Sequence, residues 1–309
     1  MAGRTWKEEE NNLLKQMVPG GRYSFKQLEP FFDKRTAAAL QNHSRILQLD
    51  NPHINYKYKF NKNYFHEPNL MNCWYAGWLA ADGSILKREC IDGIHYDLAW
   101  ECHAKDKSIQ QLFIKELNYS SNTLEFLPTI TPVNKLYEIH SRIRVNHIEQ
   151  MADDLKNNFS IINNKTYRLG PPNLSTVELK LAYLAGYING DGCVHFGTNG
   201  QLTISMVSSG LEIIKWITNL INSFDFPSPI HRKSNYYQKV NGKNAYLYHL
   251  GGVRAIYLFD LLRTIKVPIL DRKWNNPQTL NGICNVKKLH PQWFKTDLDE
   301  IRRNIGLIK

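Results

Sequence analysis

Apolar positions recur at helical spacing in two stretches of the chain that also end alike. The first stretch reads YAGWLAADG over residues 75–83, and the second reads LAGYINGDG over residues 184–192. This pattern predicts the last turns of two apolar helices, each with a column of small residues, Gly77/Ala81 in one and Gly186/Gly190 in the other. We expect the two columns to pack on each other, with a glycine ending each helix in the left-handed conformation.

The alternation of apolar and polar positions after each of these helices follows one order. The first is followed by strands that meet near Asp92-Gly93, a helix over 107–118, strands over 123–131 and 136–145, and a helix over 147–158. The second, with a capping-box pattern at Ser175 and Glu178, is followed by a hairpin over 194–208, a helix over 211–224, strands over 230–238 and 245–250, and a helix over 255–265. We therefore predict an α+β fold of two pseudo-symmetric αββαββα units, with antiparallel sheets that form a saddle.

The first 49 residues predict a separate unit of three short helices. A first helix over residues 6–18 has apolar residues at Leu13, Leu14 and Met17, a second begins after Ser24, and a third covers residues 36–49. Residues 50–68 are aromatic and basic without helical periodicity, which indicates a linker. The expected domains are thus 1–49, the linker 50–68, a first unit 69–172, a second unit 173–285, and a C-terminal extension 286–309 whose role we do not assign.

Charge and composition limit the classes of partner that the protein could bind. The formal charge of +11 and a pI near 9.3 favour a polyanion, nucleic acid before a membrane. The five cysteines lack C-x-x-C spacing, so neither a disulfide framework nor a zinc site is implied. The chain has no apolar secretion signal and no membrane-length apolar run. We expect no membrane partner and an intracellular location, cytoplasmic in a microbial or phage host or organelle-encoded.

Asp82 and Asp191 are the candidate catalytic acids. Each ends an apolar helix, where the helix dipole disfavours an anion, and a cation would reverse that effect. One Asp-Gly pair alone is more often only a turn signal. Two such pairs after matching helices that pack together predict converging carboxylates, which form a site for a hard divalent ion, Mg²⁺ or Mn²⁺.

The two stretches resemble the paired motifs of the LAGLIDADG homing endonucleases, in the single-chain form with two motifs. Ala-Gly at 76–77 and 185–186 and the terminal Asp-Gly pairs match the family, whereas Trp78 stands where Leu is usual and Ala80 and Asn189 replace an earlier, non-catalytic Asp. The resemblance implies a monomeric, site-specific homing endonuclease that hydrolyses double-stranded DNA at a long, near-asymmetric target. Residues 1–49 resemble Myb/SANT-like domains through the letters WKEEE at 6–10 and RTAAAL at 35–40.

The resemblance also implies site residues. Asp82 and Asp191 would bind metal, and we add the preceding residues Ala81 and Gly190 to the metal-binding set. Lys165, in an Asn-Lys-Thr element, and Lys273 would assist catalysis, and the alternative for both is an ordinary surface lysine. Four DNA-binding residues are expected in the N-terminal helices, Arg35, Gln41, Asn42 and Arg45, and the alternative for that unit is a helical cap without DNA contact. Seven more are expected on the sheets, each with a solvated strand residue as its alternative: His140, Arg142, Arg144, His231, Arg232, Lys233 and Lys239.

Three other functions stay open at this stage. They are an intron maturase that binds RNA on the same scaffold, a DNA-binding regulator without cleavage activity, and a structural protein. Retention of both acids argues against the regulator. An RNA backbone is also polyanionic, so the sequence does not separate a maturase from a nuclease.

Overall fold

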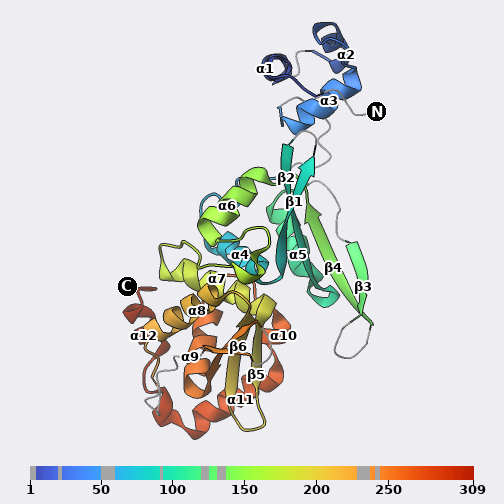
Figure 1. The fold of residues 1–309 in the computed structure, drawn as a ribbon. Coiled ribbons are helices and arrows are strands. Elements are labelled where there is room, and N and C mark those ends of the chain that lie inside the picture. The colour runs from blue at the N-terminus through green and yellow to red at the C-terminus, as the bar shows by residue number, and fades with distance from the viewer. Residues whose placement is uncertain are drawn as a thin grey trace. The chain divides into compact units, whose positions relative to one another are not determined.

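A computed structural model describes residues 5–19, 23–49, 60–90, 93–119, 125–130, 137–227, 237–240 and 244–309. Two compact units divide the chain. The first consists of residues 1–60, 88–95 and 118–122, and the second of residues 61–87, 96–117 and 123–309. Figure 1 labels most of the helices and strands, which are numbered in chain order.

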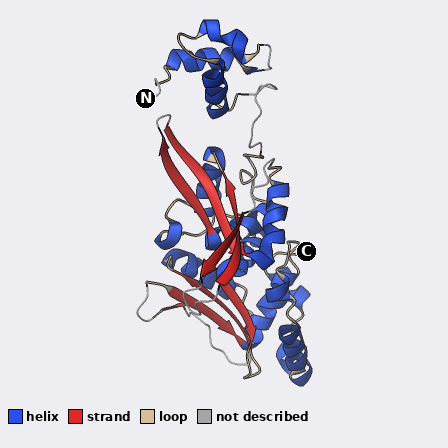
Figure 2. Ribbon diagram, turned by 90° about the vertical axis from the view of Figure 1, so that its right-hand side faces the viewer, coloured by secondary structure: helices blue, strands red, loops and turns tan. Residues whose placement is uncertain are grey.

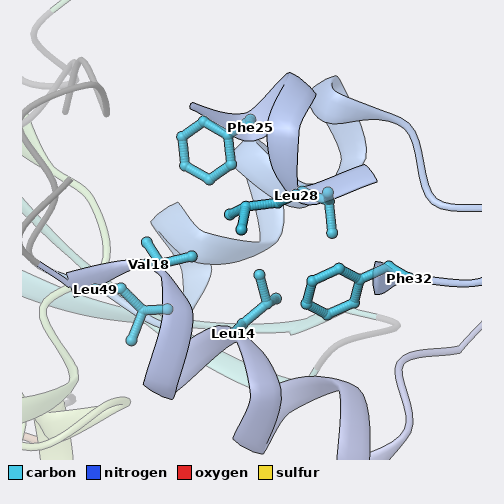
Figure 3. Packing of buried hydrophobic residues seen from close by; sticks show 7 residues of the cluster. Leu14, Val18, Phe25, Leu28, Phe32 and Leu49 are labelled. Carbon is cyan, nitrogen blue, oxygen red and sulfur yellow. The ribbon is translucent and has the colours of Figure 1, made fainter. Parts of the chain in front are cut away.

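The N-terminal part contains α1 (Glu8–Met17), α2 (Phe25–Leu28) continued by the 3₁₀ turn η2 (Glu29–Phe31), and α3 (Ala37–Ile46). Ser24 and Thr36 begin α2 and α3, because their side chains accept hydrogen bonds from the backbone N–H groups of Gln27 and Ala39. The apolar faces of these short helices meet in one small core (Figure 3), made of Leu14, Val18, Phe25, Leu28, Phe32, Leu40 and Leu49.

The predicted order of helices and strands occurs twice along the rest of the chain. The first copy is α4 (Leu70–Asp82), β1 (Gly83–Cys90), β2 (Gly93–His103), α5 (Lys107–Glu116), β3 (Glu125–Ile130), β4 (Tyr137–Val145) and α6 (Glu149–Phe159). The second is α7 (Val177–Asp191), β5 (Gly192–Phe196), β6 (Leu202–Ser208), α8 (Leu211–Ser223), β7 (Tyr237–Lys239), β8 (Tyr246–Gly251) and α9 (Gly252–Arg263). The sheets have matching strand orders, β1-β2-β4-β3 and β5-β6-β8-β7, and helices pack beside the strands (Figure 2).

Helices α4 and α7 lie side by side (Figure 1), and glycines form their contact. A Cβ atom on Gly77 would lie 2.0 Å from the carbonyl oxygen of Tyr183, and a Cβ on Gly186 would lie 1.9 Å from that of Trp74. Each backbone therefore occupies the space that a side chain on the other would need. The expectation that the two small-residue columns pack together is confirmed.

Both glycines that follow the paired helices depart from the expected conformation. Gly83 (φ −79°, ψ 160°) and Gly192 (φ −89°, ψ 154°) are extended, so the chain passes directly from helix to strand. Glycine is required there for space, because a Cβ would lie 2.7 Å from the Leu79 carbonyl oxygen at one site and 2.5 Å from that of Ile188 at the other. The left-handed ending predicted from the sequence was wrong.

Two boundaries differ from the sequence prediction. Residues 61–68 do not form a loose linker, because Phe65 is fully buried and the Asn72 side chain donates to the carbonyls of Tyr64 and Glu67, both at 2.8 Å. At the other end, the predicted boundary between 285 and 286 falls inside α11 (Pro277–Leu289). The short α10 (Asp271–Trp274), the 3₁₀ turn η5 (Pro291–Phe294) and α12 (Leu298–Asn304) complete the chain.

The start of α7 also differs by one residue. Thr176, not Ser175, caps the helix, with its hydroxyl accepting from the backbone N–H of Leu179 at 3.3 Å. Across the described parts of the chain, none of the helices has both the length and the apolar character that a membrane span requires.

Candidate active site

Asp82 and Asp191 are the last residues of α4 and α7, and the packing of these helices brings the two acids to the same end of the pair. Gly190 makes the approach close, since the position of a Cβ on it lies 3.1 Å from Oδ2 of Asp82. Both acidic side chains reach the surface. The two acids therefore stand where a solvated ion or a phosphate has access to them.

The electrostatics of this pair favour a cation. Desolvation by burial raises the pKa of the Asp191 carboxyl to about 6, and the neighbouring charge of Asp82 adds to the rise. Desolvation also raises the pKa of Asp82, against the opposing effects of the Trp78 hydrogen bond and the Lys273, Lys165 and Arg272 charges. Like charges at the negative ends of two helices are unfavourable without a counter-ion.

The oxygen atoms at this site fit a hard divalent cation. Two carboxylates and the backbone carbonyls of Ala81 and Gly190 offer oxygen ligands only, and Mg²⁺ and Mn²⁺ prefer such ligands. Each of these carbonyls already accepts a hydrogen bond from a lysine. Lys165 donates to Ala81 at 3.0 Å, and Lys273 donates to Gly190 at 3.1 Å. A carbonyl oxygen has two lone pairs, so this contact leaves it capable of a second interaction.

Lys165 opens the 3₁₀ turn η4 (Lys165–Tyr167), after Asn164 in the left-handed conformation (φ 53°). Among the residues that the structure describes, its ammonium donates one hydrogen bond, to the Ala81 carbonyl. Burial lowers the pKa of Lys165, while Asp191 and Asp82 raise it. A lysine has three N–H donors, so two of them stay available toward the acids or a substrate.

Lys273 is held very differently. It is buried in α10, and its ammonium nitrogen lies within hydrogen-bond distance of the carbonyl oxygens of Ile188 (2.7 Å), Asn189 (2.6 Å), Gly190 (3.1 Å) and Gly192 (2.6 Å), which share its three N–H donors. These groups lie at the C-terminus of α7, where helix carbonyls lack partners and a cation is favoured. Burial, together with the charge of Arg272, lowers the pKa of Lys273 to about 8. Lys273 thus caps the helix that carries Asp191.

Residues flanking Lys273 contribute contacts that the sequence did not predict. The indole of Trp274 donates to the side-chain oxygen of Asn189, the residue that stands where the resembled motif has Asp, at 2.7 Å. The indole of Trp78 donates to Oδ2 of Asp82 at 2.9 Å. The signal for Trp78 was present in the sequence as a departure from Leu, but its function as a donor was not evident from it.

The DNA-binding residues predicted in the first sheet take part in ion pairs on one face of β4. Arg142 donates to Glu101, its cross-strand partner on β2, at 2.6 Å, and His140 contacts the same carboxylate at 3.1 Å. Arg144 pairs with the fully buried Asp97 at 2.7 Å. The side chains of Arg142 and Arg144 are still 43% and 47% exposed, so both guanidinium groups remain accessible.

The other predicted DNA-binding residues have varied environments. Lys239 is exposed on β7, and His231, Arg232 and Lys233 lie outside the described residues. In the N-terminal helices Asn42 is exposed, Gln41 is half-buried, and Arg45 donates to the Asn42 side chain at 3.1 Å.

Arg35 departs from its expected place facing a DNA groove. Its guanidinium pairs with Glu10 at 2.8 Å and lies 4.1 Å from the ring centre of Trp6. The Arg35 side chain is only 7% exposed, because it packs within the N-terminal helices. The contacts with Glu10 and Trp6 therefore determine the direction of this side chain, which points into the N-terminal unit.

Comparison with known proteins gives one family match. Residues 178–265, which run from the first turn of α7 to two residues beyond α9, match the LAGLIDADG-like domain. No curated protein matches the chain. This segment includes Asp191 but neither Asp82 nor the N-terminal helices.

Three solved structures are similar to the chain, and two of them carry the same family name. The I-LtrWI LAGLIDADG homing endonuclease bound to target DNA has 13% identity, a TM-score of 0.46, and coverage of 81% of this chain and 99% of that one. The I-SmaMI LAGLIDADG homing endonuclease bound to cleaved DNA has 13% identity, a TM-score of 0.46, and coverage of 79% and 98%. I-DmoI in complex with DNA and Ca has 12% identity, a TM-score of 0.41, and coverage of 72% and 97%.

Proposed function

We propose that the protein is a metal-dependent endonuclease that hydrolyses phosphodiester bonds of double-stranded DNA at a specific site. The observation that carries this proposal is the meeting of Asp82 and Asp191 at the ends of two packed helices. The LAGLIDADG-like domain at residues 178–265 supports the same activity. We also propose that the protein acts as a monomer, because one chain supplies both acids.

The residues around the two acids have distinct parts in the proposed reaction. Asp82 and Asp191, with the carbonyls of Ala81 and Gly190, would hold Mg²⁺ or Mn²⁺. When bound, such an ion supplies the positive charge that stabilises a phosphodiester transition state. Lys165 has N–H donors left to orient a water or a phosphate oxygen, whereas the four carbonyl contacts of Lys273 assign it to holding the end of α7.

Recognition of DNA would fall to basic side chains on the sheets and the N-terminal helices. We propose that the two sheets form a saddle on the duplex, with Arg142, Arg144 and Lys239 toward its grooves and phosphates. Asn42 and Arg45 would add contacts from a Myb-like N-terminal domain. The net charge of +11 supports binding to a polyanion, and Arg and Asn side chains are suited to paired hydrogen bonds with base edges.

Two variants test the proposal. Cleavable sites are first selected from a randomised duplex library with the full chain and Mg²⁺, and Asp82→Asn and Asp191→Asn are then assayed on the selected sequence. Each is expected to bind the DNA as the wild type does and to lose cleavage by at least about 10³-fold, because a ligand for the cation is gone. Asp153→Asn, at an exposed position on α6, is the matched control.

Two outcomes would reject the proposal. Cleavage by either acid variant at the wild-type rate would show that the acids do not hold the catalytic ion. A wild-type protein that promotes splicing of an intron and leaves every duplex intact would favour the RNA-splicing alternative.

A further inference from the structure

The two acids of the site are not held in the same way. Oδ2 of Asp82 accepts a hydrogen bond from the indole of Trp78, one helical turn earlier on α4. The corresponding position on α7 is Tyr187, and no hydrogen bond to Asp191 occurs among the residues that the structure describes. The difference lies in residues at matching positions of two otherwise repeated helices.

The indole of Trp78 is a rigid donor. It is 1% exposed, and it packs edge-on against Trp74, with ring centres 5.7 Å apart, and against Trp100 on β2, with ring centres 5.3 Å apart. Rings packed at such angles and distances in a close-packed interior have no alternative orientation at low cost. The N–H group is therefore fixed in space before any ligand arrives.

Gly190 of α7 allows this contact to form. A Cβ atom there would lie 3.2 Å from Cδ1 of Trp78 and 3.1 Å from Oδ2 of Asp82, so a side chain would press on both ends of the hydrogen bond. One helix thus supplies the donor and the acceptor, and the other supplies the space. Oδ1 of Asp82 makes no hydrogen bond within the described chain and stays available to a ligand.

We propose that Trp78 is a positioning residue that fixes Asp82 for the cation, so that Asp82 contributes more to cation affinity than Asp191 does. This inference rests on the proposed function. A carboxylate already held in one rotamer loses less conformational freedom when it binds an ion. Loss of a hydrogen-bond partner that orients a metal ligand typically weakens metal affinity by roughly 10- to 100-fold.

The test is a Mn²⁺ titration of the full chain by calorimetry, without DNA. Trp78→Phe removes the N–H and keeps an aromatic ring, and it is expected to weaken Mn²⁺ binding by about tenfold. Trp74→Phe is the matched control: it makes the same change one turn earlier, in the same core, at an indole N–H that has no hydrogen-bond partner in the described chain. Urea unfolding of both variants reports any loss of packing separately from the loss of affinity.

Combined variants separate positioning from general packing. In an Asp82→Asn background, Trp78→Phe is expected to have no further effect on Mn²⁺ affinity, because the carboxylate that it orients is gone. In an Asp191→Asn background the tenfold effect should persist. A structural role alone would weaken binding in all backgrounds alike, and it would do so for Trp74→Phe as well.

Three results would overturn the inference. Unchanged Mn²⁺ affinity in Trp78→Phe, or equal weakening by Trp74→Phe, would reject the positioning role while leaving the acid site and the proposed function intact. An effect of Trp78→Phe that survives in Asp82→Asn would do the same. If the wild type binds no Mn²⁺, or if both acid variants bind it as the wild type does, then the proposed function and this inference fail together.

Discussion

The guanidinium of Arg272 forms a bidentate ion pair with the carboxylate of Asp106, which lies 166 positions earlier in the chain. Nη2 lies 2.8 Å from one carboxylate oxygen, and Nε lies 3.1 Å and 3.2 Å from the two oxygens. Asp106 ends the 3₁₀ turn η3 (Ala104–Asp106) of the first repeat, whereas Arg272 lies in α10, after the second. Because Lys273 follows Arg272, the pair anchors α10 where it caps α7.

Removal of Arg272 should destabilise the protein, because it leaves the buried Asp106 carboxylate without its partner. We expect Arg272→Met to lower the free energy of unfolding by about 2 to 3 kcal/mol, less than for a fully buried pair since Arg272 is half-exposed. Urea unfolding measures this change. Adding Asp106→Asn should restore part of the loss, and a double variant that is less stable than Arg272→Met would contradict the assignment.

Replacement of the two site lysines, Lys165 and Lys273, should lower the stability of the protein by different amounts. Lys273→Met leaves several carbonyls at the end of α7 without a donor, and we expect a loss of about 3 kcal/mol of unfolding free energy, against about 1 kcal/mol for Lys165→Met with its single contact. Thermal unfolding compares the variants. On selected DNA, Lys165→Met is expected to lose catalytic rate while keeping near-normal stability. Equal shifts in Tm would show that the four carbonyl contacts do not form in solution.

The raised pKa of Asp191 predicts a pH dependence of stability. Folding moves this pKa from its ordinary value of 3.8 to about 6, so the folded state holds a proton more tightly than the unfolded state does. The contribution of Asp191 to stability is therefore complete below about pH 3.8 and is lost as the pH rises through 6. Without divalent ions, Asp191→Asn should be more stable than the wild type at pH 7.5, and the gap should shrink toward pH 4.

Denaturant unfolding of the two proteins at pH 4.5, 6 and 7.5 measures this gap. Cation binding should follow the same trend as the gap, strengthening as the pH rises through 6, because the ion competes with the proton for the carboxylate. A stability gap that is constant with pH would contradict a raised pKa at Asp191.

The glycine contact between α4 and α7 should tolerate no side chain. Gly186→Ala places a Cβ 1.9 Å from a backbone oxygen of Trp74, which forces the helices apart, and we expect a loss of more than about 3 kcal/mol together with loss of cation binding. Gly170→Ala is the control, since its Cβ would meet Ser160 at an ordinary 3.5 Å. Circular dichroism during urea unfolding compares them. Equal stability of the two variants would show that the helices do not pack through Gly186.

The spacing of small and apolar residues was enough to predict the helix pair and its acids. Residues 75–83 and 184–192 carry the same local pattern twice, and the α4–α7 packing follows from side chains that are absent at Gly77 and Gly186. The helix and strand order was likewise readable, because alternation and helical periodicity are local properties. The extended glycines at 83 and 192 were missed, since a helix that runs straight into a strand has no common sequence signal.

Contacts between distant residues account for what the sequence did not determine. The sequence predicts that Arg35 faces a DNA groove, whereas in the structure it pairs with Glu10 and lies over the ring of Trp6. The sequence predicts the same catalytic role for Lys273 and Lys165. Only in the folded chain does the end of α7 contact Lys273. By itself the sequence determined which residues form the helices and which acids end them. The tertiary structure decided which side chain each acid and lysine meets, because those partners lie far apart along the chain and become neighbours only when the repeats pack.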